Sequence, residues 1–161
     1  MRRRYIIPTA LVATAAIAAG AGTGASAKSD APKKLKCKIE MFALGQPNPS
    51  VAHLGFVKCP KPFGRGLHYN RVTITKKPSP GVPGAATGKF KNYYNRGTTT
   101  GTVVLTIVVT SPLNQTYTGT VTYTGGTGRF RHVKGSGKIE CTTADAGAHK
   151  SCKVKSTLTG V

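Results

Sequence analysis

Residues 101–124 read GTVVLTIVVTSPLNQTYTGTVTYT, two runs of alternating polarity separated by the turn sequence SPLN at 111–114. A period of two is typical of β-strands, in which successive side chains point to opposite faces. In the second run Thr118, Thr120 and Thr122 share one face, which we expect to point outward. The other face of this predicted hairpin should be buried, together with a residue further along the chain: Val103, Leu105, Ile107, Val109, Tyr117, Val121, Tyr123 and Phe130.

The rest of the chain continues the same period and contains no window with apolar residues at helical spacing. Turn sequences rich in Pro, Gly, Asn and Ser separate the runs of alternating residues. The sequence therefore predicts an all-β fold, a single antiparallel eight-stranded β-barrel, with a β-sandwich as the alternative. The expected strands are 34–42, 51–58, 67–76, 88–96, 101–110, 115–124, 129–141 and 150–159.

The N-terminal segment has the composition of a cleaved secretory signal. Three arginines at 2–4 precede an apolar run from Ile6 to Ala19, and Ala25-Ser26-Ala27 is a small-x-small cleavage sequence. We therefore expect a signal peptide at 1–27, a short tail at 28–33 and the barrel domain at 34–161. No later stretch holds 18 uninterrupted apolar residues, so we expect no transmembrane segment in the mature chain and predict a secreted, extracellular protein.

Four cysteines remain after that cleavage, an even number in an oxidising compartment, which predicts two disulfides with three possible pairings. We favour Cys37 with Cys59 and Cys141 with Cys152, because the second pair flanks a turn-rich stretch between two alternating runs. A zinc site is disfavoured, since no Cys-x-x-Cys pair is present. If Cys141 faces Cys152 in an antiparallel hairpin, facing residue numbers sum to about 293, and Lys138 then faces Lys155.

One motif carries a family resemblance. The stretch GGTGRFRHVKGSG at 125–137 resembles the Gly-Gly-Thr-Gly-x-Phe-x-x-Ala-x-Gly signature of the allene oxide cyclase and dirigent barrel superfamily, with Val133 in place of the usual Ala. The resemblance covers about residues 85–141 and implies an eight-stranded antiparallel barrel. We interpret the motif as a fold determinant at a barrel corner rather than a ligand contact. Its residues are Gly125, Gly126, Gly128, Phe130 and Gly135.

Catalytic chemistry has little support in the sequence. The four acidic residues are Asp30 near the mature terminus, Glu40 and Glu140 on wet strand faces, and Asp145 in a turn, and none aligns with the acidic cavity residues of the enzymes in that superfamily. Four histidines, at 53, 68, 132 and 149, have no metal-ligand spacing and are interpreted as surface or structural residues. We therefore predict no catalytic residue, no metal and no cofactor.

The charge balance gives the main functional hypothesis. Lys and Arg number 24 against 4 Asp and Glu, and loss of residues 1–27 would reduce the formal charge from +20 to +17. Such a field attracts polyanions, so we expect binding of anionic envelope polymers, with no specific nucleic acid recognition. Closure of a barrel would gather the candidate patch on one outer surface: Lys34, Lys36, Lys38, Lys138, Lys153 and Lys155.

Two other hypotheses stay open. An eight-stranded barrel can hold one small apolar ligand, and Tyr117 and Tyr123 are then the candidate pocket residues. A cyclase-like enzyme is less favoured, because acids are scarce. The oligomeric state cannot be deduced from these patterns.

Overall fold

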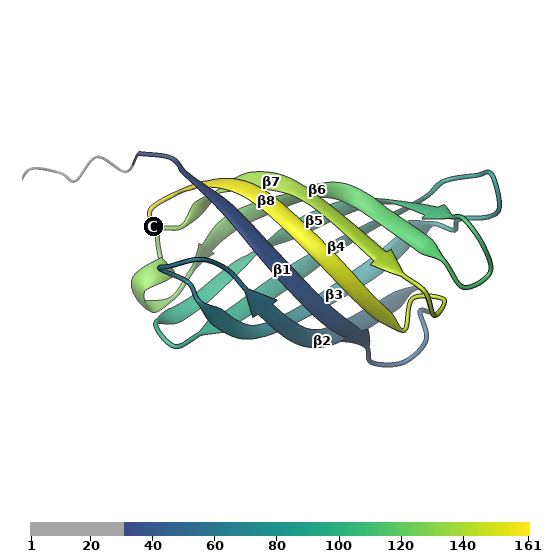
Figure 1. Ribbon diagram of the computed structural model, residues 1–161, viewed down its shortest axis with the longest axis horizontal. Coiled ribbons are helices and arrows are strands. Elements are labelled where there is room, and N and C mark those ends of the chain that lie inside the picture. Colours follow the sequence, from purple (N-terminus) through teal and green to yellow (C-terminus); the bar gives the residue numbers. More distant parts are fainter. Residues whose placement is uncertain (1–30) are drawn as a thin grey trace, which may run out of the picture.

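The structure is a computed structural model that describes residues 31–161. The expected signal segment, 1–27, lies outside the described residues. Eight antiparallel strands close into one barrel in sequence order, and β1 pairs with both β2 and β8 (Figure 1). The predicted eight-stranded barrel is thus confirmed. Its elements are β1 (Lys33–Ala43), β2 (Ser50–Lys58), β3 (Arg65–Lys76), β4 (Gly84–Tyr94), β5 (Gly97–Val109), β6 (Gln115–Gly126), η1 (Gly128–Phe130), β7 (Lys134–Thr143) and β8 (His149–Thr159).

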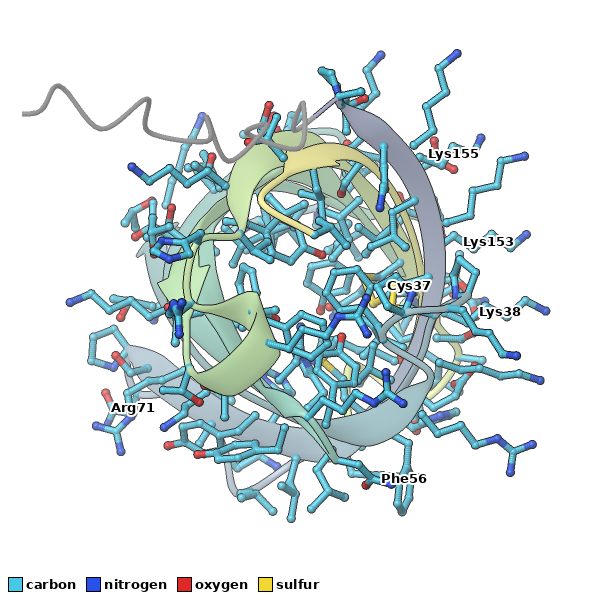
Figure 2. The ribbon with its side chains drawn as sticks, turned by 90° about the vertical axis from the view of Figure 1, so that its left-hand side faces the viewer. Cys37, Lys38, Phe56, Arg71, Lys153 and Lys155 are labelled. Carbon is cyan, nitrogen blue, oxygen red and sulfur yellow. A yellow bond between two sulfur atoms is a disulfide. The ribbon has the colours of Figure 1, made fainter. Side chains whose placement is uncertain are left out.

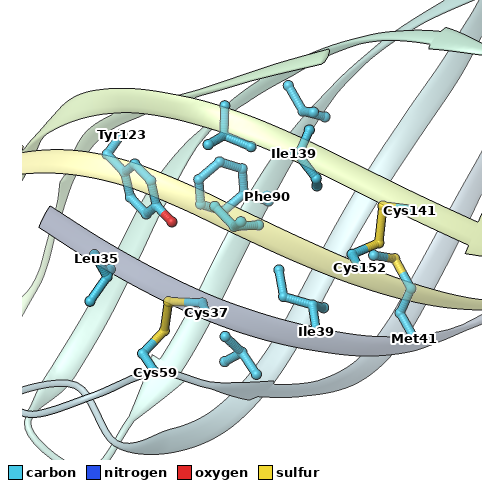
Figure 3. Close-up of a cluster of buried hydrophobic side chains, with 14 of the residues drawn as sticks. Leu35, Cys37, Ile39, Met41, Cys59, Phe90, Tyr123, Ile139, Cys141 and Cys152 are labelled. Atoms are coloured by element: carbon cyan, nitrogen blue, oxygen red, sulfur yellow. A yellow bond between two sulfur atoms is a disulfide. The ribbon is translucent and has the colours of Figure 1, made fainter. Parts of the chain in front are cut away.

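Both predicted disulfides are present, Cys37–Cys59 and Cys141–Cys152, and both lie inside the barrel (Figure 3). The second pair sets the β7–β8 register as expected: Lys138 faces Lys155, and Ile139 faces Val154. Each disulfide closes a loop between neighbouring strands and so lowers the conformational entropy of the unfolded chain. In the chain-entropy model this stabilises the folded state by about 3 kcal/mol per disulfide.

Alternation decides which side chains fill the barrel. The apolar positions predicted from residues 101–124 are buried, except that Val109 at the end of β5 is half-buried because the strand ends there. The threonines at 118, 120 and 122 are exposed, as expected. Ile39, Phe90, Tyr123 and Ile139 meet in the interior from four different strands (Figure 3).

The glycine-rich motif has a different conformation from the predicted strand 129–141. Gly128–Phe130 form the 3-10 turn η1, and β7 begins only at Lys134. A Cβ on Gly128 would lie 2.5 Å from the Arg96 carbonyl oxygen, and its φ of +57° favours glycine, so the turn packs closely on the β4–β5 loop. Phe130 is completely buried and stacks on Phe63 at 4.6 Å between ring centroids. The motif therefore places an aromatic plug at one end of the barrel.

Within residues 31–161 no helix is long and apolar enough to cross a membrane. The loops joining β1–β2, β3–β4, β5–β6 and β7–β8 lie together at the end opposite to η1 (Figure 1). They surround the region described next.

Candidate functional site

A cavity of about 380 Å³ occupies the interior of the barrel and extends to the loops opposite η1. Much of its wall is apolar, with Val103, Leu105 and Ile107 of β5 and Ile139 of β7 among the lining residues. The two tyrosines predicted as pocket residues, Tyr117 and Tyr123, are buried and line it as well. This volume lies within the range of small-molecule sites.

One side of the cavity carries polar residues from β2, β3 and β4, at positions whose alternation points them inward. His53, His68, Asn70 and Asn92 are each no more than 7% exposed. A buried polar group without a hydrogen bond is costly, so the way in which these side chains satisfy one another determines whether the barrel tolerates them.

Lys150 begins the hydrogen-bonded chain that joins these groups. It lies on β8 with its Nζ 2.8 Å from His53 Nε2. An ammonium can only donate, so Nε2 of His53 accepts, and the proton of this neutral ring resides on Nδ1. Nδ1 then donates to Asn70 Oδ1 at 2.7 Å.

The hydrogen-bonded chain of side chains continues from Asn70 with the same order of donor and acceptor. Asn70 Nδ2 donates to His68 Nε2 at 3.1 Å, and His68 Nδ1 donates to Asn92 Oδ1 at 2.6 Å. Asn92 Nδ2 in turn donates to Thr99 Oγ1 on β5 at 3.1 Å. Every donor from Lys150 to Asn92 therefore points the same way around the barrel, and both histidines are neutral Nδ1–H tautomers.

Burial and this hydrogen-bond direction both oppose protonation of the histidines. Desolvation, followed by the nearby Lys150 charge, lowers the pKa of His53 to about 4. Desolvation likewise lowers the pKa of His68. A second proton on either ring would sit on Nε2 and face a donor, Lys150 Nζ or Asn70 Nδ2, so the chain exists only with neutral rings.

Lys150 itself is 8% exposed and lies at the loop end of the cavity. Its ammonium donates to the Gly147 carbonyl oxygen and lies 5.3 Å from the centre of the Tyr117 ring. Burial lowers the pKa of Lys150 to about 8, although Asp145 opposes that shift. The Tyr117 hydroxyl donates to Gln115 Oε1 beside it.

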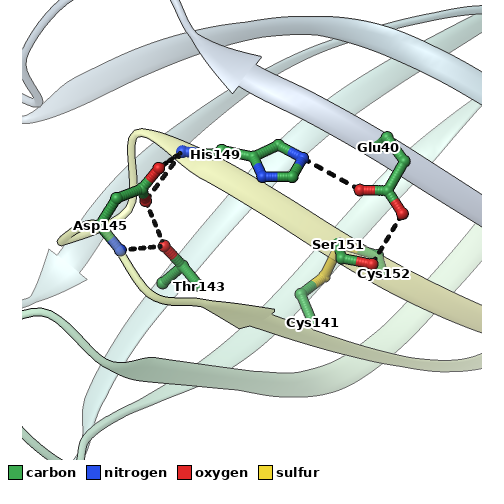
Figure 4. Close-up of polar contacts among 7 residues, drawn as sticks. All are labelled: Glu40, Cys141, Thr143, Asp145, His149, Ser151 and Cys152. Carbon is green, nitrogen blue, oxygen red and sulfur yellow. Dashed lines mark hydrogen bonds and ion pairs between the residues drawn. A yellow bond between two sulfur atoms is a disulfide. The ribbon is translucent and has the colours of Figure 1, made fainter.

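The acidic side chains near this end of the barrel form hydrogen bonds with groups other than Lys150 (Figure 4). Asp145 accepts hydrogen bonds from the Thr143 hydroxyl and the His149 amide, which order the β7–β8 loop and lower the pKa of its carboxyl group. Glu40 accepts from Ser151 Oγ at 2.7 Å and lies 3.0 Å from His149 Nε2. Both carboxylates therefore stabilise the surface of the loop end.

The inward-facing polar residues were not predicted from the sequence. His53 and His68 were interpreted only as surface or structural histidines, and Lys150, Asn70 and Asn92 carried no prediction. The disulfides could have predicted these residues. Because Cys152 points inward, Lys150, two residues before it on the same strand, lies on the same inward face. An inward Cys59 places His53 inside for the same reason.

The six lysines predicted to form a patch are exposed on β1, β7 and β8, which are neighbouring strands. Lys155 faces Lys36 on one side and Lys138 on the other, and Lys153 faces Lys38. Lys34 lies two residues before Lys36 on β1, opposite Thr157. Lys38, Lys153 and Lys155 project from the same side of the barrel (Figure 2).

Within the described residues, no group of three His, Cys, Asp or Glu side chains is arranged to hold a metal ion. No protein-family model matches the chain, and no curated protein matches it. Among solved structures, a pyocyanin demethylase is similar over 78% of this chain and 98% of its own, with a TM-score of 0.40 and 14% sequence identity.

Proposed function

We propose that the barrel binds a small, largely apolar molecule in its interior. The observation that carries this proposal is the cavity of about 380 Å³, whose walls combine aliphatic and aromatic side chains with a few fixed polar groups. Such a combination is typical of small-molecule sites, in which apolar walls supply affinity and polar groups supply orientation. The polar chain is also satisfied internally, so the unliganded site needs no large rearrangement to be stable.

The test uses the neutral fluorescent probe N-phenyl-1-naphthylamine and a variant that fills the cavity. Ala86 is 1% exposed and lines the cavity on β4, so Ala86→Leu should weaken probe binding by about tenfold or more. Ala85 precedes it on the same strand with the opposite orientation, and Ala85→Leu is the matched control. Absence of probe binding to the wild type, or equal binding by the two variants, would contradict the proposal.

A second candidate function is weak binding of anionic polymers on the outer surface. It is supported by the register that places Lys36, Lys155 and Lys138 side by side across three strands. Exposed lysines act as dispersed positive charge, so binding should be independent of sequence and fall steeply with salt. Replacement of all six patch lysines by Gln should lower the salt at which the protein elutes from heparin. Equal elution salt for the two proteins would remove the patch from consideration.

We also propose a relationship to the allene oxide cyclase and dirigent barrel superfamily, together with export as a secreted, non-catalytic protein. The sequential eight-stranded barrel and the position of the glycine-rich motif between β6 and β7 support the first part. Two disulfides and the N-terminal signal sequence support the second. Mass spectrometry of the exported protein should find an N-terminus at Lys28.

A further inference from the structure

Lys150 is a buried cation whose hydrogen-bond partners are neutral. Its Nζ contacts the His53 imidazole nitrogen and the Gly147 carbonyl oxygen, and both groups accept without carrying a negative charge. Among residues 31–161, no carboxylate oxygen lies within 4.0 Å of this nitrogen. Asp145 and Glu40 are held by other donors, as described above, and Glu140 is exposed on β7, opposite Lys153.

Asp145 also lines the cavity and raises the pKa of Lys150, but it forms no ion pair with this ammonium, so the buried charge is only partly compensated. A buried charge without a paired counterion is costly, and an opposite charge brought by a ligand offsets that cost. An ammonium has three N–H donors, and two of its acceptors are identified here, which leaves one donor for a ligand. The amine lines the loop end of the cavity, while the apolar wall extends from it along β5 and β7. One molecule can therefore contact both.

We propose that the ligand of this barrel is an organic anion, with its charged head on Lys150 and its apolar body in the cavity. This inference rests on the proposed function and adds the charge and orientation of the ligand. The polar chain has a direct role in it: the neutral His53 accepts from Lys150 and so fixes the ammonium without neutralising it. The cation is thereby positioned in advance, and little ordering is left to oppose binding.

Two probes with the same aromatic body separate the two proposals. 1-Anilinonaphthalene-8-sulfonate carries a sulfonate, and N-phenyl-1-naphthylamine lacks it. Wild-type protein should bind the sulfonate probe about tenfold more tightly or better, the range expected for a hydrogen bond to a charged group. Lys150→Met should remove that advantage and leave binding of the neutral probe within about threefold.

Lys153 provides the matched control, because it lies on the same strand and faces outward. Lys153→Met should leave both dissociation constants unchanged, whereas an equal loss in both variants would show that the sulfonate binds the charged surface and would overturn the inference. Near-ultraviolet circular dichroism and intact disulfides establish that each variant is folded.

A measurement on the wild type alone keeps the inference testable if Lys150→Met does not fold. Burial lowers the pKa of Lys150 to about 8, so affinity for the sulfonate probe should fall between pH 8 and 10 while affinity for the neutral probe stays constant. A flat profile for both probes would overturn the inference. If the neutral probe binds and the sulfonate probe binds no better, the proposal of an anionic ligand is overturned and the proposal of a cavity for an apolar molecule stands. If neither probe binds, the proposed function itself fails.

Discussion

At the η1 end of the barrel the interior is filled by aromatic rings, whereas toward the loop end it holds a cavity beside a chain of polar side chains. At the η1 end Phe130 packs against Phe63 and Tyr94, whose ring centroids lie 4.6 and 5.5 Å from its own. At the loop end, His53 and Lys150 are also buried, but they contact each other through a hydrogen bond. The same strands thus support a closed apolar core at one end and a polar-lined cavity at the other, and we infer that stability and binding are separated along the barrel axis.

The largest effect should come from the aromatic end. Phe130→Ala removes a fully buried ring and should lower the free energy of unfolding by about 3–5 kcal/mol, measured by urea denaturation with the disulfides intact. Phe56→Ala is the control, because this side chain is 65% exposed on the outer face and should cost less than about 1 kcal/mol. Comparable losses for the two variants would show that the plug is not a principal source of stability.

The second effect tests the neutral histidines of the polar end. Burial penalises the charged ring and lowers the folded pKa of both histidines below the ordinary value of 6.5. The pKa of His53 is lowered to about 4. The unfolded chain therefore binds more protons below pH 6.5, so stability is present above that pH and lost as the pH falls. The shift of His53 alone should cost about 1.5 kcal/mol between pH 6.5 and 5, and His68 adds to this loss in the same direction.

His53→Gln should reduce that acid loss by about 1.5 kcal/mol, because the contribution of this ring is removed and that of His68 remains. His132→Gln is the control, since this ring is exposed beyond η1 and does not belong to the buried chain. A wild-type unfolding free energy that stays constant from pH 6.5 to 5 would contradict the neutral, buried state of both rings.

A third prediction concerns Asn70, the link between the two histidines. Asn70→Leu keeps the approximate volume but leaves His53 Nδ1 and His68 Nε2 without partners, at about 2–3 kcal/mol of unfolding free energy. Thr122→Val on the outer face of β6 changes a polar group that water can replace and should stay within about 0.5 kcal/mol. Equal stability of Asn70→Leu and wild type would mean that the chain does not contribute to the folded state.

The difference between the two ends also explains what the sequence could reveal. The eight strands, the β7–β8 register and the disulfide pairing follow from alternation and cysteine spacing. They were confirmed, including Lys138 facing Lys155, except that residues 129–133 are not part of a strand. The polar end was missed because assignment by polarity places His, Asn and Lys in water, whereas strand phase places Lys150 inside. Burial there depends on partners from five strands, and only the closed barrel brings those strands together.

The conformation of the motif could not be obtained from period two either. Residues 129–133 were included in the predicted strand 129–141, and yet they form the end of η1 and the turn after it. The φ of Gly128 and its close approach to the Arg96 carbonyl favour a compact turn over an extended strand at this point. Phe130 is buried as predicted, but as a plug at the barrel end rather than a strand residue in the wall.

The smallest expected effect is a change in the free energy of unfolding at alkaline pH, and it depends on Lys150. Burial lowers its folded pKa to about 8, whereas in the unfolded chain its pKa lies near 10.5. Between these values the unfolded chain binds more protons, so the free energy of unfolding should rise by about 1–2 kcal/mol from pH 8 to 10.

The rise should end near pH 10, because burial raises the pKa of Tyr117 to about 12 and also raises those of Tyr94 and Tyr123. Above pH 10 these tyrosines ionise more readily in the unfolded chain, and stability falls. Lys150→Met should abolish the rise between pH 8 and 10 and keep the fall above it, whereas Lys153→Met should keep both. A rise that survives in Lys150→Met would assign it to another group, and the buried cation would then no longer distinguish the loop end from the aromatic end.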